Sequence, residues 1–219
     1  MKRRSAAILV ACFFAVGVIA GGVAAVLTDL NGILFPPPPP APILPCSVDE
    51  ENASLCSLEA ALRAVLLLRD GDYTRLADMA HPDKGIVFVP YSHVDLEANL
   101  CFSADQVRQF GTDSTAYIWG LTEGDGAPIL MTPVEYFARY VYNVDYSAAK
   151  MIGVGTVLKT GNALENVADA FPDAAFIELH MPGADPQSEG LGWNSLKVVL
   201  EVQNGVEYIV ALIHSEWTV

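Results

Sequence analysis

Apolar and polar residues alternate most regularly in the last 27 residues of the chain. Two runs, residues 193–203 and 206–217, flank the dipeptide Asn204-Gly205, which is typical of a two-residue hairpin turn. The pattern therefore predicts two long antiparallel strands. The turn also sets a register that collects apolar residues on one face. In that register the apolar pairs are Leu200 with Ile209, Val198 with Ala211 and Leu196 with Ile213.

The opposite face of this hairpin is mixed, as expected of a sheet that lines a polar cavity, an interface or solvent. It carries Lys197 and Glu216, and it pairs Ser195 with His214 across the two strands. A β-bulge anywhere in the hairpin would exchange the two faces beyond it.

Farther upstream, residues 57–70 have the apolar spacing of an amphipathic helix. Ser57 is the expected N-cap, and Gly71 supplies a left-handed cap at the other end. Asp72 is placed to cap a second short helix, which His81-Pro82 ends because proline disfavours helical geometry at the preceding residue. The side chains expected to face inward from the first helix are Leu58, Leu62, Val65 and Leu66.

The middle of the chain mixes short strands and short helices. Strands are predicted over residues 86–89, 115–122 and 175–181. Ser103 is expected to cap a helix that runs through Phe110. A second helix should run from Thr132-Pro133-Val134-Glu135 to about Asn143, because that start combines a hydroxyl cap, an early proline and a glutamate three residues on.

The N-terminal residues 5–28 hold no charge across 24 positions and follow Lys2, Arg3 and Arg4. As a helix this run would be about 36 Å long, enough to cross a bilayer core. Residues 1–4 should then stay in the cytoplasm and the rest of the chain should lie outside. The run fits an uncleaved signal anchor, and also a signal peptide cleaved after the small residues 23–25. Cys12 follows a short sequence like a lipid-attachment box, but the apolar run continues beyond it.

Residues 29–45 predict a spacer, since positions 36–45 hold seven of the fourteen prolines. A run of this kind adopts an extended polyproline helix about 30 Å long. The folded domain is therefore expected to span residues 46–219. The whole chain carries 12 Lys plus Arg against 26 Asp plus Glu, a net charge of −14, which argues against binding to nucleic acid.

Three of the four cysteines lie beyond the predicted membrane segment, where thiols tend to pair. Cys46 and Cys56 are ten residues apart and would close a small loop, leaving Cys101 free in an apolar setting. Pairing of Cys56 with Cys101 is the alternative. No cysteine pair has metal-ligand spacing and no glycine-rich phosphate loop is present, so we expect neither a metal nor a cofactor.

The order of the elements resembles the nuclear-transport-factor-two-like (cystatin-like) superfamily. The resemblance rests on residues 66–80, with the Arg69–Tyr73 join between the first two helices, and on the hairpin 193–217. More closely, the chain is similar to uncharacterised secreted or membrane-anchored proteins of Gram-positive bacteria. The matching segments are His81 to Tyr91, Phe102 to Asp105, Trp193 to Leu196 and Ile213 to Thr218.

The resemblance implies an α+β fold in which N-terminal helices pack on a curved, mainly antiparallel, cone-like sheet. It does not imply one function, because that superfamily holds enzymes, binding modules and protein-partner domains. Enzymes of the superfamily use an Asp or His inside the cone, but no motif in this sequence identifies an equivalent residue.

Five residues are candidates for lining a ligand site: Tyr91, Trp119, Tyr140, Ser195 and His214. Tyr136 and Tyr140 are one helical turn apart and could offer stacking surfaces. Ser195 beside His214 suggests a nucleophile and its base, but flat strands provide neither a sharp turn nor an oxyanion hole. No complete catalytic set converges, so no residue is assigned a catalytic role.

We therefore expect a membrane-tethered binding or interaction module of the cell envelope, whose partner is an envelope protein or a small molecule. The alternative is a small-molecule enzyme of cyclase or isomerase type, with His214 or His81 as base. A homodimer through the sheet is a third arrangement.

Overall fold

The computed structural model describes residues 52–183 and 191–218. Contacts divide the chain into two units, Met1–Leu44 and Pro45–Val219, and all described residues belong to the second. The predicted cytoplasmic residues 1–4, the membrane segment 5–28, the spacer 29–45 and Cys46 all lie outside the described residues. Among the described residues, no helix is long and apolar enough to cross a membrane.

The described part of the chain is an α+β domain built on a six-stranded sheet. Its elements, in chain order, are α2 (Ala53–Asp70), α3 (Tyr73–Asp78), β1 (Ile86–Val89), β2 (Leu100–Phe102), α4 (Ala104–Gln109), β3 (Tyr117–Leu121), β4 (Pro128–Met131), α5 (Pro133–Tyr136), the π-helical turn η1 (Phe137–Val141), the 3₁₀ turn η2 (Tyr146–Ala148), β5 (Met151–Val154), α6 (Val167–Ala170), β6 (Ala175–Met181), β7 (Asn194–Gln203) and β8 (Val206–Glu216).

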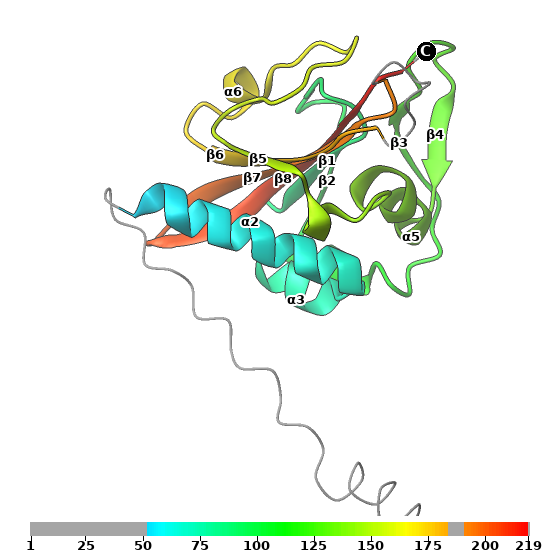
Figure 1. Ribbon diagram of the computed structural model, residues 1–219. Coiled ribbons are helices and arrows are strands. Elements are labelled where there is room, and N and C mark those ends of the chain that lie inside the picture. Colours follow the sequence, from blue (N-terminus) through cyan, green and yellow to red (C-terminus); the bar gives the residue numbers. More distant parts are fainter. Residues whose placement is uncertain (1–51, 184–190, 219) are drawn as a thin grey trace, which may run out of the picture. The chain divides into compact units, whose positions relative to one another are not determined.

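The sheet has the strand order β2-β1-β8-β7-β6-β5 and is mainly antiparallel, as the sequence predicts. β1 pairs with β8 in parallel, and the other neighbours are antiparallel. Strands β3 and β4 form a separate two-stranded sheet. Helix α2 crosses one face of the large sheet, and α6 lies on the other face (Figure 1).

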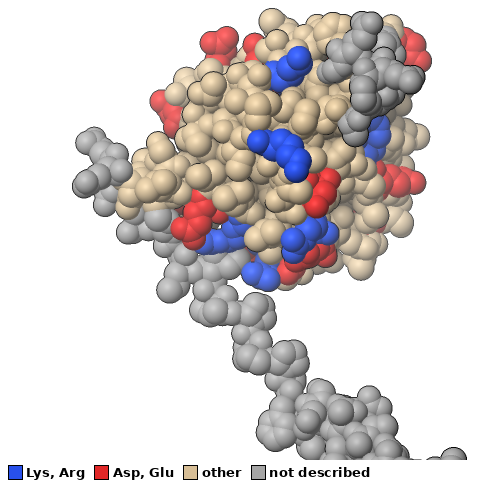
Figure 2. Space-filling view, viewed as in Figure 1, with Lys and Arg blue, Asp and Glu red and all other residues tan. Residues whose placement is uncertain are grey.

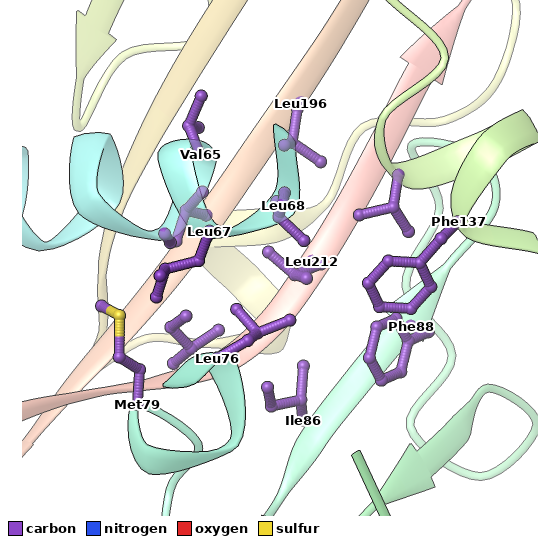
Figure 3. Packing of buried hydrophobic residues seen from close by; sticks show 14 of the residues in the cluster. Val65, Leu67, Leu68, Leu76, Met79, Ile86, Phe88, Phe137, Leu196 and Leu212 are labelled. Carbon is purple, nitrogen blue, oxygen red and sulfur yellow. The ribbon is translucent and has the colours of Figure 1, made fainter. Parts of the chain in front are cut away.

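The main core lies between the helices and the face of the sheet that they cover, called the inner face below. Side chains from α2, α3, β1, η1, β7 and β8 converge there (Figure 3). Phe88 is at its centre, with its ring 5.5–5.9 Å from those of Phe102, Phe110, Trp119 and Phe137. The space over the inner face is therefore filled by apolar and aromatic side chains.

Four predicted helix caps are confirmed. Gly71 ends α2 in the left-handed region at φ 64°, and the Asp72 side chain accepts the Arg75 backbone N–H at 3.0 Å at the start of α3. Ser103 and Thr132 each form a capping box, with Gln106 and Glu135 as their partners.

The predicted start of the first helix is wrong, and its predicted inner face is confirmed for Leu58 and Val65 but wrong for Leu62 and Leu66. The helix begins one turn earlier, at Ala53, and Ser57 lies inside it with its hydroxyl bonded to the Ala53 carbonyl and to Glu207. Leu62 and Leu66 are exposed, whereas alanines at positions 60, 61 and 64 are buried. Small residues face the sheet because they allow the helix backbone to approach it closely. In the space-filling view from the same side, several charged groups gather in the lower part of the domain, where α2 lies, and a broad uncharged area lies above them (Figure 2).

The predicted hairpin register holds only near the turn. Leu200 pairs with Ile209 and Glu201 with Tyr208, but Val199 pairs with Ala211, so Val210 forms a bulge. The reason lies outside the hairpin. The Ile209 N–H donates to the Met79 carbonyl, and the Ile209 carbonyl accepts the His81 N–H. These two bonds turn the peptide groups of Ile209 toward residues 79–81 and away from β7.

Beyond the bulge the residues of β8 lie on the face opposite to the one predicted, whereas those of β7 keep their predicted faces. Leu196 pairs with His214 and faces the inner core, and Ser195 pairs with Ser215 on the other face. The predicted pairs Val198 with Ala211, Leu196 with Ile213 and Ser195 with His214 are therefore wrong.

The other side of the sheet, the outer face, is covered by residues 155–171, called the cover segment below. Val167 and Phe171 pack there against Val199, Ala211 and Ile213. Two asparagine side chains fix the cover segment by hydrogen bonds to the backbone. Asn166 accepts the Val94 N–H and donates to the Val94 carbonyl, and Asn162 makes the same two bonds to Thr218. A Cβ at Gly161 would lie 2.6 Å from the Glu216 carbonyl oxygen, so the segment needs glycine there.

The sequence reading missed β2, β4 and β5. Cys101, expected to be buried, is exposed on β2 with a free thiol. Cys56 is disulfide-bonded, which removes the alternative pairing of Cys56 with Cys101. Pairing with Cys46 stays a prediction, because Cys46 is not described.

Candidate functional site

The structure brings four of the five candidate ligand residues into one cluster on the inner side of the sheet. This Tyr140 cluster consists of Tyr91, Trp119, Tyr136, Tyr140 and His214. Trp119 and Tyr136 are stacked with ring centroids 3.8 Å apart, and Tyr136 lies 5.2 Å from Tyr140. The Tyr140 ring meets Tyr91 and His214 edge-on, each at 5.7 Å.

The members of the Tyr140 cluster differ in their access to solvent. Trp119 is fully buried, and its indole N–H donates to the Met131 carbonyl at 2.9 Å. Tyr91 is half-buried, and its hydroxyl lies 3.4 Å from that of Tyr140, which is long for a bond between hydroxyls. Burial raises the pKa of the Tyr140 hydroxyl far above its ordinary value. Tyr91 is therefore the member best placed to meet a ligand.

His214 is held at the end of this cluster by polar groups from three segments. Its Nδ1 donates to the Pro90 carbonyl at 3.0 Å, and its Nε2 lies 3.4 Å from Asn143 Nδ2 and 3.2 Å from Asn194 Oδ1. Asn143 in turn accepts the Tyr146 hydroxyl at 2.9 Å. Burial lowers the pKa of His214 to about 4, so the ring is neutral at physiological pH. Both of its nitrogens have partners within the protein.

Arg139 and Glu216 form the exposed rim next to His214. Their side chains pair at 2.6 Å, and the Arg139 guanidinium lies 4.5 Å from the centre of the Tyr140 ring. The π-helical turn η1, closed by a bond of 2.7 Å from the Tyr142 N–H to the Phe137 carbonyl, places Arg139 beside Tyr140. Such turns often occur at functional sites.

Ser195 is not part of this cluster. It is fully buried on the outer face, where its hydroxyl lies 2.9 Å from His180 Nδ1. Burial lowers the pKa of His180. The Ser195–His214 arrangement that the sequence suggested therefore does not exist.

The sequence reading missed a second polar group, the Lys197 cluster, which consists of Lys197, Glu165, Glu178, Ser92 and Ser215. The Lys197 ammonium is fully buried beneath the cover segment, 2.7 Å from Glu165 and 3.9 Å from Glu178. It donates to Ser215 at 2.8 Å, and Ser92 donates to the same hydroxyl at 2.9 Å. A lysine in a strand next to serines predicts a solvated face, and nothing local in the sequence indicates the cover segment that buries it.

The Lys197 cluster lacks the parts of a nucleophilic site. Both serines are buried, and the amine that would have to act as a base is paired with a carboxylate. Among the described residues, no group of His, Cys, Asp or Glu side chains is arranged to hold a metal ion. The contacts suit a polar lock between cover segment and sheet.

His81, the other histidine considered as a base, is hydrogen-bonded to the backbone of the turn that follows it. Its Nδ1 accepts the backbone N–H groups of Asp83 and Lys84 at 3.2 and 3.1 Å. The ring thereby shapes the turn that leads into β1 and has no free acceptor nitrogen.

Comparisons with known proteins add little to this geometry. No protein-family model matches the chain, and no curated protein matches it. One solved structure, a designed nuclear-transport-factor-two-like protein named Rd1NTF2_05 that carries five substitutions, is 13% identical. It covers 76% of this chain and 100% of its own, with a TM-score of 0.31.

Proposed function

We propose that this chain is a binding or interaction module of the bacterial cell envelope, tethered to the membrane by residues 5–28 and placed outside the cytoplasm. The observation that carries the proposal is the filled inner face of the sheet. Where a cone-shaped enzyme keeps its pocket, this domain has the stacked Trp119 and Tyr136 and the aromatic core around Phe88.

The partners of the ionisable groups also favour binding over catalysis. His214 uses both of its ring nitrogens in contacts within the protein, and His81 uses its Nδ1 as an acceptor. An acid–base catalyst needs a nitrogen within reach of a substrate proton. In contrast, exposed apolar side chains occur on three separate elements, at Leu62 of α2, Leu130 of β4 and Ile152 of β5.

The location is tested by labelling Cys101 in intact cells with a maleimide that cannot cross membranes. Because this thiol is exposed and free, a domain outside the cytoplasm is labelled without lysis, and Cys101→Ser abolishes the label. Labelling that appears only after lysis would refute the location. The same assay on culture supernatant distinguishes a cleaved signal peptide from an anchor.

Binding is tested by placing a photo-crosslinking residue at Leu62, Leu130 or Ile152, with the exposed Glu97 as the control position. At least one apolar position should give a discrete adduct in living cells, and Glu97 should give none. If none of the three positions gives an adduct, the proposal of an interaction module fails.

The alternative is an enzyme that acts on a small molecule at the Tyr140 cluster, and one observation favours it: a buried histidine with a pKa of about 4 next to the half-buried Tyr91. A small molecule that stabilises the protein against heat, and fails to do so after Tyr91→Ala, would support this alternative. The sheet-mediated homodimer would have to use an edge strand, because both faces of the sheet are covered in the described residues.

A further inference from the structure

The two-stranded sheet β3–β4, called the ribbon below, is apolar on both of its faces. Its inner face sends Trp119 and Ile129 into the core, where both are buried. Its outer face holds Ile118 opposite Leu130 and Leu121 opposite Pro128. Ribbons with one solvated face normally alternate apolar and polar residues, so four apolar residues on that face call for a covering partner.

No described residue covers this outer face. Ile118, Leu121 and Leu130 are 57%, 59% and 62% exposed. Cross-strand partners lie close together, so these side chains form one continuous patch and not scattered single residues. Within the described residues β4 has a strand neighbour on one side only, and it lies at the outer margin of the fold (Figure 1). An unpaired edge of this kind can accept another strand.

The segment of the chain that contains the ribbon, between Arg108 and Arg139, carries charges of one sign. Residues 109–138 contain four acidic residues and no Lys or Arg. Glu123 and Asp125 lie in the turn between the two strands, and Asp113 and Glu135 lie four residues before β3 and four residues after β4, at the other end of the ribbon.

Hydrogen bonds keep three of these four groups ionised. The pKa of Asp113 is lowered by bonds from Thr115 and Tyr117. The pKa of Asp125 is lowered by Thr122 and Ala127, and that of Glu135 by Thr132. The four acidic residues at the two ends of the ribbon, called the acidic frame below, therefore give the apolar patch a negatively charged border at physiological pH.

We propose that the ribbon binds an extended polypeptide segment in which basic and apolar side chains alternate. The segment adds a strand at the β4 edge, its apolar side chains cover Ile118 and Leu130, and its basic side chains meet the carboxylates at both ends of the ribbon. This inference rests on the proposed function and specifies the surface and the partner class.

Two other occupants fit less well. A second copy of the chain would bring a net charge of −14 against this acidic frame. An anionic membrane surface would repel it in the same way. A basic peptide satisfies both the apolar patch and its frame.

The test uses the full chain in nanodiscs of uncharged phosphatidylcholine and a labelled decapeptide of alternating Lys and Val, followed by fluorescence anisotropy. The matched peptide replaces every Lys by Glu, and empty nanodiscs report binding to lipid. The ribbon variant is Ile118→Thr/Leu130→Thr, which keeps good strand formers at exposed positions. The control variant is Val202→Thr, at an apolar position of similar exposure on β7.

We expect the Lys peptide to bind the protein, the ribbon variant to bind it at least tenfold more weakly, and Val202→Thr to bind it unchanged. Binding should weaken in 0.5 M salt, since screening shortens the reach of the carboxylates. Circular dichroism checks that each variant is folded, and the single variants replace the double one if it is not.

Any of four results would overturn the inference: no binding of the Lys peptide up to about 1 mM, equal binding of the Glu peptide, equal binding by the ribbon variant, or tighter binding at the ribbon by a peptide of residues 29–45. Oligomers that dissociate on mutation of the ribbon would assign the surface to a second copy instead. If crosslinking yields adducts from Leu62 or Ile152 and none from Leu130, the ribbon inference fails while the proposed function stands.

Discussion

Replacing Lys197 by methionine tests whether the Lys197 cluster locks the cover segment onto the sheet. The substitution removes a fully buried ammonium from between Glu165 and Glu178 while keeping a side chain of similar length. Glu178 is then a buried carboxylate with no cation. Its Oε2 keeps the Leu158 N–H at 3.0 Å, but its Oε1 has no hydrogen-bond partner among the described residues.

Breaking a buried ion pair by removing one partner costs about 3–5 kcal/mol. Each kcal/mol lowers the melting temperature of a domain of this size by about 2–4 °C, so the expected loss is about 6–20 °C. Thermal and urea unfolding can be followed by tryptophan fluorescence, because Trp119, Trp193 and Trp217 all lie in the described domain.

Two further variants make this reasoning refutable. Lys197→Met/Glu178→Met removes the two fully buried charges and leaves Glu165, whose side chain is 13% exposed, so it should regain part of the lost stability. Lys84→Met breaks the surface pair with Glu201 and should change stability very little. A cost below about 1 kcal/mol for Lys197→Met, or no recovery in the double variant, would show that the cluster is not a lock.

Two more predictions concern pH and backbone geometry. Burial lowers the pKa of His214 from 6.5 to about 4, so protonation of this side chain favours the unfolded chain. The contribution of His214 to the free energy of unfolding should therefore be constant above about pH 6.5. It should fall by about 3 kcal/mol as the pH drops to about 4. The difference between the wild type and His214→Asn in urea unfolding at several pH values isolates this contribution, and equal pH dependence of the two proteins would contradict it. Gly85→Ala should destabilise the protein far more than Gly126→Ala, as measured by urea unfolding. Both glycines have a positive φ, 71° and 69°, so the backbone strain of the two substitutions is similar. However, a Cβ at position 85 would lie 2.3 Å from the Phe102 carbonyl oxygen, whereas a Cβ at position 126 meets nothing within 4 Å. Equal losses would mean that strand β2 moves aside at no cost.

Local chemistry was readable from the sequence. The left-handed end of α2 at Gly71, the cap at Ser103, the capping box at Thr132 and the Asn204-Gly205 turn all formed as expected, with Asn204 at φ 54° and Gly205 at φ 77°. Each depends on hydrogen bonds or backbone preferences within about four residues, so neighbouring residues are sufficient to specify it.

The inner side of α2 could not be read in the same way. Residues 58–68 are apolar on almost every side of the helix, so periodicity alone does not select a face. Contact with the sheet selected the alanines, and it left Leu62 and Leu66 in solvent.

The candidate site shows the same division between local and long-range causes. The sequence indicated Tyr91, Trp119, Tyr140 and His214, and the fold brought them together through Tyr136. Ser195 is not part of this group, because one bulge residue moved His214 to the other face of the hairpin.

The sequence by itself determined the turns, the caps, the strand-forming runs and the acidic charge, because each is a property of neighbouring residues or of composition. Only the tertiary structure decided which side of the hairpin each residue occupies. Met79 and His81, more than a hundred residues away, bind the backbone of Ile209 and produce the bulge that turns His214 inward, away from the outer face on which Ser195 lies. It also decided that Lys197 is buried, because the cover segment that encloses it is held by hydrogen bonds to Val94 and Thr218, which lie far from it in the chain.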